Sequence, residues 1–131
     1  MIPESLSAMC RRLGPPALAL ALLAAAPASA QNCDSAEQTQ LEMNNCAAAF
    51  YADADADLNA VWPEAMAAAR AAGAGDELLA AQRAWLAFRD AACTAEAAIF
   101  AGGSIAPMVH ADCLTRLTQT RRDDLYAMLM P

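Results

Sequence analysis

The fold of this chain is decided by residues 76–101, which read DELLAAQRAWLAFRDAACTAEAAIFA. At about 100° per residue, the apolar side chains of this stretch share one side of a helix. They are Leu78, Leu79, Trp85, Leu86, Phe88, Cys93, Ile99 and Phe100. Gln82, Arg89 and Glu96 fall inside the same arc and recur at every seventh position. We call these three residues the polar ladder. Because an unpaired buried ion costs several kcal/mol, their side chains are predicted to have polar or charged partners on neighbouring helices.

A second helical pattern precedes this stretch, from about residue 36 to residue 72. Pro63 removes a backbone donor and predicts a kink after Trp62, so one bent helix and two shorter segments are both possible. The glycines at 73 and 75 are expected to end this helical pattern, and Asp76 is the expected N-cap of the next helix. That helix is expected to end at Gly102 and Gly103, since glycine can take the left-handed C-terminal conformation.

A third helix is expected after Ser104, its predicted N-cap, with Pro107 in its first turn. Arg121 sits in the centre of its apolar stripe, as Arg89 does in the helix before it. Antiparallel hairpins about the two glycine-containing turns place Arg89 level with residues 55–59 and with Thr118. The sequence therefore predicts an all-α fold, a small antiparallel helical hairpin or three-helix bundle, with a carboxylate of the first helix facing an interior arginine.

The first thirty residues have the pattern of a secretory signal peptide. Arg11 and Arg12 precede an Ala/Leu run over residues 17–26, and an Ala-x-Ala cleavage site ends at Ala30. The run is too short to span a bilayer, and Cys10 and Cys33 both lack the small-residue context of a lipoprotein cysteine. We expect a signal peptide at 1–30 and one domain at 31–131, periplasmic or secreted, with no membrane anchor after the signal is removed.

The charge of residues 31–131 limits the classes of partner. This part keeps six of the eight arginines and fourteen of the fifteen acidic residues, which gives a net charge of −8. Such a surface makes nucleic acid an unfavourable partner and favours cationic proteins. The repeated Asp53, Asp55 and Asp57 scatter around a helix, so we interpret them as a solvated face with at least one turning inward, and we expect no metal and no cofactor.

Four cysteines remain after the signal: Cys33, Cys46, Cys93 and Cys113. An even count in an exported chain indicates two disulfides, and a metal site would need C-x-x-C spacing or clustered histidines, whereas His110 is the single histidine. Cys93 and Cys113 each lie about ten residues from the second turn, which places them at one level on neighbouring helices. We therefore predict the pairs Cys93–Cys113 and Cys33–Cys46.

Five strings in this order, with the four cysteines in place, resemble the LprI-type lysozyme-inhibitor domain family. They lie at 40–46 (QLEMNNC), 54–59 (ADADLN), 81–93 (AQRAW and FRDAAC), 102–108 (GGSIAPM) and 113–121 (CL, LT and a final R). Two features depart from the family pattern: Trp62 stands where tyrosine is usual, and the stretch before Gly73 is rich in alanine. The resemblance implies an exported, helical, disulfide-stapled domain whose namesake inhibits lysozyme. It also favours Asp55 as the partner of Arg89, where the helical wheel alone favours Asp57.

These observations together predict an exported, non-enzymatic binding protein, with lysozyme as the candidate partner. The main alternative is a structural or chaperone-like periplasmic module without activity against lysozyme, and a further one is an acidic site for a metal or a cationic ligand. No acid/base pair or nucleophile triad emerges, since Ser104 lies outside a G-x-S-x-G elbow and would have to use His110 as its base.

Two groups of residues are the candidate site. Gly102, Gly103 and Ser104 form either a contact loop for a partner or simply the caps of a helix-helix turn. We interpret the polar ladder as a buried structural network rather than a catalytic one, and the two tryptophans as core residues. The residues of that network are Asp55, Gln82, Arg89, Glu96, Thr118 and Arg121.

Overall fold

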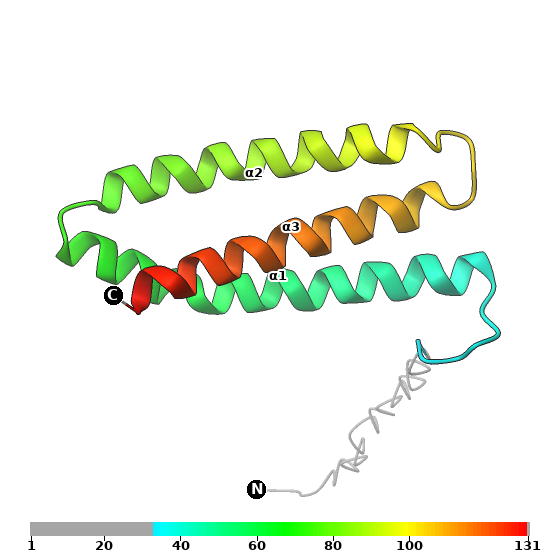
Figure 1. The fold of residues 1–131 in the computed structure, drawn as a ribbon, viewed down its shortest axis with the longest axis horizontal. Coiled ribbons are helices and arrows are strands. Elements are labelled where there is room, and N and C mark those ends of the chain that lie inside the picture. Colours follow the sequence, from blue (N-terminus) through cyan, green and yellow to red (C-terminus); the bar gives the residue numbers. More distant parts are fainter. Residues whose placement is uncertain (1–32, 131) are drawn as a thin grey trace, which may run out of the picture.

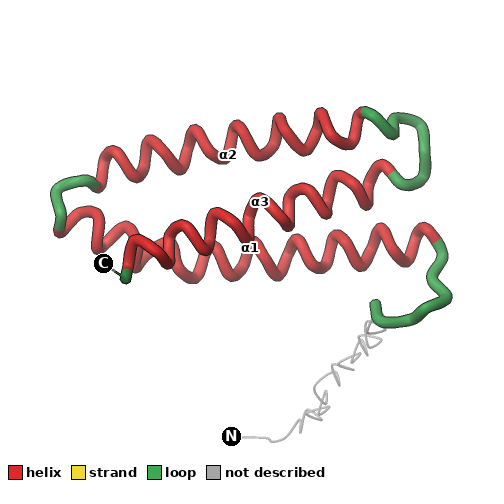
Figure 2. The backbone as a smooth tube through the Cα atoms, viewed as in Figure 1, coloured by secondary structure: helices red, strands yellow, loops and turns green. Residues whose placement is uncertain are grey.

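The computed structural model describes residues 33–130 and shows three helices in chain order. They are α1 (Gln40–Ala71), α2 (Gly75–Ala98) and α3 (Ala106–Leu129), drawn in Figure 1. Figure 2 shows helices and connecting loops, and no strand, over these residues. The all-α prediction is confirmed, while the predicted signal peptide at 1–30 lies outside the described residues.

The helices form an antiparallel arrangement in which α3 returns between the other two (Figure 1). α1 packs most extensively against α3, less extensive contacts join α2 to α3, and α1 and α2 touch least. Short connections after α1 and after α2 enforce this order, as expected for consecutive helical hairpins. The α1–α3 pair therefore forms the main packed unit of the fold, and α2 packs against it with a smaller contact.

Local sequence explains the ends of α1. Thr39 is the N-cap, and its side chain and that of Glu42 form a reciprocal capping box, so the helix begins at Gln40 rather than near residue 36. Gly73 has a φ of +78°, and the amides of residues 73 and 74 return to the carbonyls of Arg70 and Ala69, which is a Schellman motif. α1 continues through Pro63 as one element, so of the two possibilities left by the sequence, the structure has the single helix.

The starts of α2 and α3 differ from the prediction. Ala74 and Ile105 are the N-cap residues, and neither helix has a side-chain cap bond. Asp76 lies inside the first turn of α2, where its carboxylate favours the helix N-terminus without capping it. Ser104 precedes the N-cap of α3, so the predicted capping roles of Asp76 and Ser104 are wrong.

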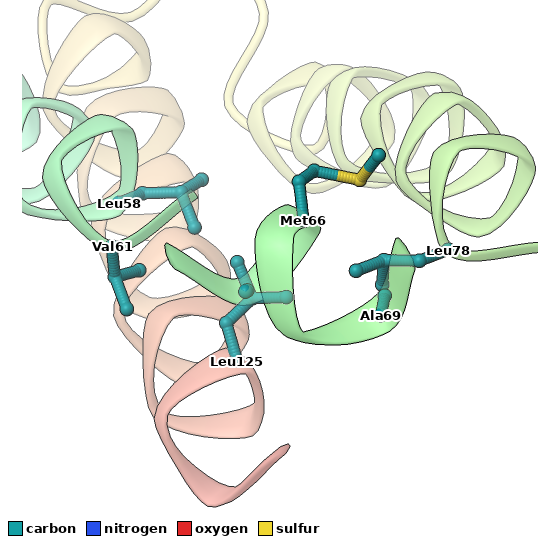
Figure 3. Close-up of a cluster of buried hydrophobic side chains, with 7 residues drawn as sticks. Leu58, Val61, Met66, Ala69, Leu78 and Leu125 are labelled. Carbon is teal, nitrogen blue, oxygen red and sulfur yellow. The ribbon is translucent and has the colours of Figure 1, made fainter. Parts of the chain in front are cut away.

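The main core lies near the turn between α1 and α2. Figure 3 shows Leu58, Val61, Met66 and Ala69 of α1 gathered with Leu125 of α3 and Leu78 of α2. Ala65 is also buried there, and the half-buried Trp62 and Trp85 pack against this cluster. The two tryptophans thus take the core positions predicted for them.

The apolar arc of α2 is narrower than predicted. Of the eight large side chains in the predicted arc, only Leu78 and Cys93 are buried. Leu86 and Phe88 of α2 are exposed, and so are Ile99 and Phe100, which follow the last residue of the helix. α2 contacts the α1–α3 pair through a narrow part of its surface. Side chains at the edges of its apolar arc therefore reach solvent instead of the neighbouring helices. The eight side chains thus follow one side of a helical pattern, as the sequence indicates, but the neighbouring helices cover only part of that side.

Both disulfides join the predicted cysteines. Cys93 and Cys113 link α2 to α3 in a second, smaller buried cluster that includes Leu114. Cys33 is bonded to Cys46 and ties the segment before Thr39 back onto α1. The two bridges therefore fix the outer helix and the amino-terminal segment, the two parts with the least apolar burial.

Candidate functional site

Two exposed apolar residues project at the α2–α3 loop, which we define as residues 99–105. Ile99 is 78 % exposed and Phe100 is 42 % exposed, and alanine, two glycines and serine follow them. An isoleucine side chain this exposed contributes little to the free energy of folding, since apolar side chains stabilise a fold by being removed from water. The loop therefore presents a small apolar surface beside residues too small to obstruct an approaching partner.

Hydrogen bonds hold this loop to the start of α1. Asn44 donates from Nδ2 to the carbonyl of Ser104 at 3.0 Å. Its Oδ1 accepts a hydrogen bond from Gln40 Nε2 at 2.9 Å, and the same Nε2 lies 3.9 Å from Met108 Sδ. The loop is thus positioned by side chains of α1 and α3 as well as by its own backbone.

The two glycines of the loop have conformational roles. Gly102 has a φ of +81°, which favours glycine, and Gly103 donates from its amide to the carbonyl of Phe100 at 3.0 Å. A Cβ at Gly103 would lie 3.2 Å from that carbonyl oxygen. The turn itself accounts for both glycines, and the better contact candidates are Ile99 and Phe100. Sequence reasoning missed these two, although their position one alanine before the glycine pair was a usable signal.

Arg89 occupies the space between α1 and α2 and is only 7 % exposed. Its Nη1 lies 3.7 Å from Asp55 Oδ1, which is an ion pair without a hydrogen bond. The shorter contacts are to Asp90 on its own helix, at 2.9 Å from Nε and 2.8 Å from Nη2. The structure thus places Asp55 beside Arg89, as predicted, and adds Asp90, whereas Asp57 accepts a hydrogen bond from Arg122.

Two aromatic rings flank the guanidinium of Arg89. Its Cζ lies 5.1 Å from the ring centre of Trp85 and 5.6 Å from that of Tyr51, both within the range of cation–π attraction. Burial raises the pKa of the Tyr51 hydroxyl, and the positive charge of Arg89 opposes part of that rise. Trp85 comes from α2 and Tyr51 from α1, so this cluster is the principal polar contact between those two helices.

Three of the four remaining residues of the predicted network form two other contacts, and Thr118 takes part in neither. Arg121 donates from Nε to Gln82 Oε1 at 2.8 Å, which joins α3 to α2. Thr118 is fully buried, and within the described residues its Oγ1 makes no hydrogen bond. Glu96 is exposed and binds Arg116 at 2.9 Å, so its place in a buried network is wrong. Glu96 sits near the end of α2, where the neighbouring helices leave its arc open to solvent.

Two further features concern the residues that the sequence offered for catalysis or metal binding. Over residues 33–130, no hydrogen bond joins Ser104 to His110, and no group of three or more histidine, cysteine or acidic side chains could hold a metal ion. None of the three helices is both long enough and apolar enough to cross a bilayer. The described part also presents exposed apolar side chains at the α2–α3 loop and along α2.

Comparison with known proteins adds a family to this geometry. The family model described as "Lysozyme inhibitor LprI" matches residues 30–125. The chain is also similar to "Uncharacterized protein R02472" of Rhizobium meliloti (strain 1021), with 37 % identity over 134 residues that cover 90 % of this chain and 96 % of the relative. No solved structure matches it. The family model describes inhibitors rather than catalysts, and together with the two disulfides it indicates an extracytoplasmic protein.

Proposed function

The chain belongs to the LprI family of lysozyme inhibitors, and from this premise we propose that it is an exported, non-enzymatic protein that binds lysozyme and blocks its action. In this proposal residues 31–131 act in the periplasm or outside the cell. Lysozymes of the common animal type are basic, and the net charge of −8 on residues 31–131 favours their approach.

The observation that carries the proposal is the exposed apolar pair at the α2–α3 loop. Ile99 and Phe100 are displayed beside a glycine-glycine-serine turn that Asn44 fastens to α1. Binding energy at protein interfaces comes mainly from a few residues, often aromatic, that are buried in well-packed pockets of the partner. We place the contact with lysozyme at this loop, where a narrow, preorganised edge can enter a substrate groove.

The test is inhibition of lysozyme by purified residues 31–131 with intact disulfides, measured as the clearing of a cell-wall suspension. Phe100→Ser should weaken inhibition by at least tenfold, because it removes an anchor without altering the turn. Phe88→Ser is the matched control, since Phe88 is 59 % exposed on α2, outside the loop, and its loss should leave inhibition unchanged.

Two outcomes would contradict the proposal. Absence of inhibition by the wild-type domain at a large molar excess would favour the structural or chaperone-like module, for which the other exposed apolar residues of α2 would be the candidate surface. Equal weakening by the two phenylalanine variants would show that inhibition does not depend on the loop.

A further inference from the structure

An open groove of about 450 Å³ runs between α1 and α3. Its walls include Asp53 and Asp57 of α1 and Asp112 of α3, with Phe50 among the lining residues. Successive residues of a helix are about 100° apart, so Asp53 and Asp57 lie within roughly 40° of each other and about 160° from Asp55. Since Asp55 faces α2, the groove opens on the other side of α1 from α2.

A second, more apolar hollow of about 220 Å³ adjoins this groove. The two share Phe50 and Asp112, and the hollow is lined further by Met43, Met108 and the Cys33–Cys46 bridge. Phe50 is 51 % exposed, although it lies on the best-packed helix of the fold. Methionine side chains adapt to varied apolar shapes, so this compartment can accept a partner's side chain. We call the two compartments together the α1–α3 groove.

The positive and negative charges of the α1–α3 groove do not balance. Asp57 accepts a hydrogen bond from Arg122 at 3.1 Å, and Arg116, the arginine among the lining residues, is bound by Glu96 at 2.9 Å. The carboxylates of Asp53 and Asp112 form neither a hydrogen bond nor an ion pair within residues 33–130. Partial burial raises the pKa of Asp112, so its ionised form would be stabilised by an incoming cation.

The α1–α3 groove adjoins the α2–α3 loop. Met108 lines the apolar compartment and contacts Gln40, which binds Asn44, and Asn44 holds the carbonyl of Ser104. One partner can therefore touch the loop and the groove together. A contact of this kind needs a basic side chain beside an apolar one, to match the acidic and the apolar compartments.

We propose that the α1–α3 groove is a second contact surface for lysozyme, and that it receives an arginine of lysozyme at Asp53 and Asp112 and a neighbouring apolar side chain at Phe50 and the two methionines. Arginine fits better than lysine here, since its planar donors can reach two carboxylates at once. This inference rests on the proposed function for the identity of the partner.

The first experiment measures lysozyme binding kinetics at physiological salt with two charge-matched double variants. Asp53→Asn with Asp112→Asn should weaken binding at least tenfold, mainly through faster dissociation, because a direct contact is lost. Glu64→Gln with Asp124→Asn changes the net charge equally, with one exposed acid from α1 and one from α3, and should alter only the association rate, by less than threefold. Equal effects of the two pairs would overturn the groove as a contact surface and leave charge steering alone.

The second experiment separates the groove from lysozyme. The 15N-labelled domain is titrated with an acetylated, amidated Leu-Arg-Leu-Arg-Leu peptide and with the same peptide carrying citrulline in place of arginine. The arginine peptide should shift the amide signals of Phe50, Asp53 and Asp112, and the citrulline peptide should not. Shifts without lysozyme inhibition would support the groove and refute the proposed function. Inhibition that survives in the groove variant, with no peptide shifts, would refute the groove alone.

Discussion

Removal of the Cys93–Cys113 bridge should destabilise the domain far more than removal of the Cys33–Cys46 bridge. The two closed loops span 20 and 13 residues, so loop entropy alone predicts a similar cost of about 3 kcal/mol for each. The difference must come from what each bridge holds in the folded state. Cys93 and Cys113 are almost fully buried and hold α2, whose buried side chains are few.

Replacement of both residues by alanine should therefore add a packing loss on the order of 1–2 kcal/mol to the entropic cost, for a total of about 4–5 kcal/mol. The Cys33–Cys46 bridge restrains residues 33–39, none of which is buried. Without it this segment regains freedom in the folded state too, which offsets part of the loop entropy. We expect a cost of about 1–2 kcal/mol for Cys33→Ala with Cys46→Ala.

The measurement is urea unfolding of residues 31–131 followed by circular dichroism, with hydrogen exchange to locate the weakened region. In the Cys93→Ala, Cys113→Ala variant, the amides of α2 should lose protection before those of α1 and α3. The other double variant should lose protection only near Thr39. Equal destabilisation by the two pairs, or uniform loss of protection, would refute the argument that α2 depends on its bridge.

Three further predictions concern single side chains. Arg89→Met should cost about 1–3 kcal/mol by urea unfolding, below the 3–5 kcal/mol of a broken buried pair, because Asp55 and Asp90 are partly exposed and mainly the aromatic contacts are lost. Gln82→Leu should cost about 1–2 kcal/mol, since it removes the acceptor of Arg121, while Gln82→Glu keeps an acceptor and should cost less. Asp112→Asn should raise Tm at pH 7 and not at pH 3: the folded-state pKa of Asp112 is raised, so its carboxylate destabilises the fold as pH rises through that value. A lower Tm for Asp112→Asn at pH 7 would contradict this assignment.

The parts of the fold that could be predicted from sequence depend on local chemistry and on position along a hairpin. Gly73 stops α1 because its left-handed backbone closes the Schellman motif, and this needs no knowledge of tertiary structure. Cys93 and Cys113 meet because equal distances from a turn place residues at one level. The pairing of Arg89 with Asp55 followed from the same register, together with the family resemblance.

The predictions that failed concern which side chains of a helix are buried, and this depends on how much of its surface the neighbouring helices cover. A helical wheel places Phe88, Glu96 and Ile99 in one arc with Arg89, but it does not give the width of the strip that neighbours bury. α2 contacts the α1–α3 pair along a narrow strip, so Phe88 and Glu96 reach solvent. Ile99 follows the last residue of α2 and is exposed as part of the loop. Thr39 was also missed as a cap, because the helical pattern extends past it and only the Thr39–Glu42 capping box marks the boundary.

The Ala-Asp repeat of α1 places carboxylates on two opposite sides of one helix, one facing α2 and the other lining the groove that we propose as a binding surface. Because spacing by two turns a side chain through about 200°, Asp55 faces the opposite side of α1 from Asp53 and Asp57. Asp55 helps to balance the charge of Arg89 and so joins α2 to α1, while Asp53 stays unpaired in the groove beside α3. Alanine at the intervening positions lets α3 approach closely, with Ala54 buried between the helices. Loss of charge at Asp55 should therefore affect stability, whereas loss of charge at Asp53 should affect binding.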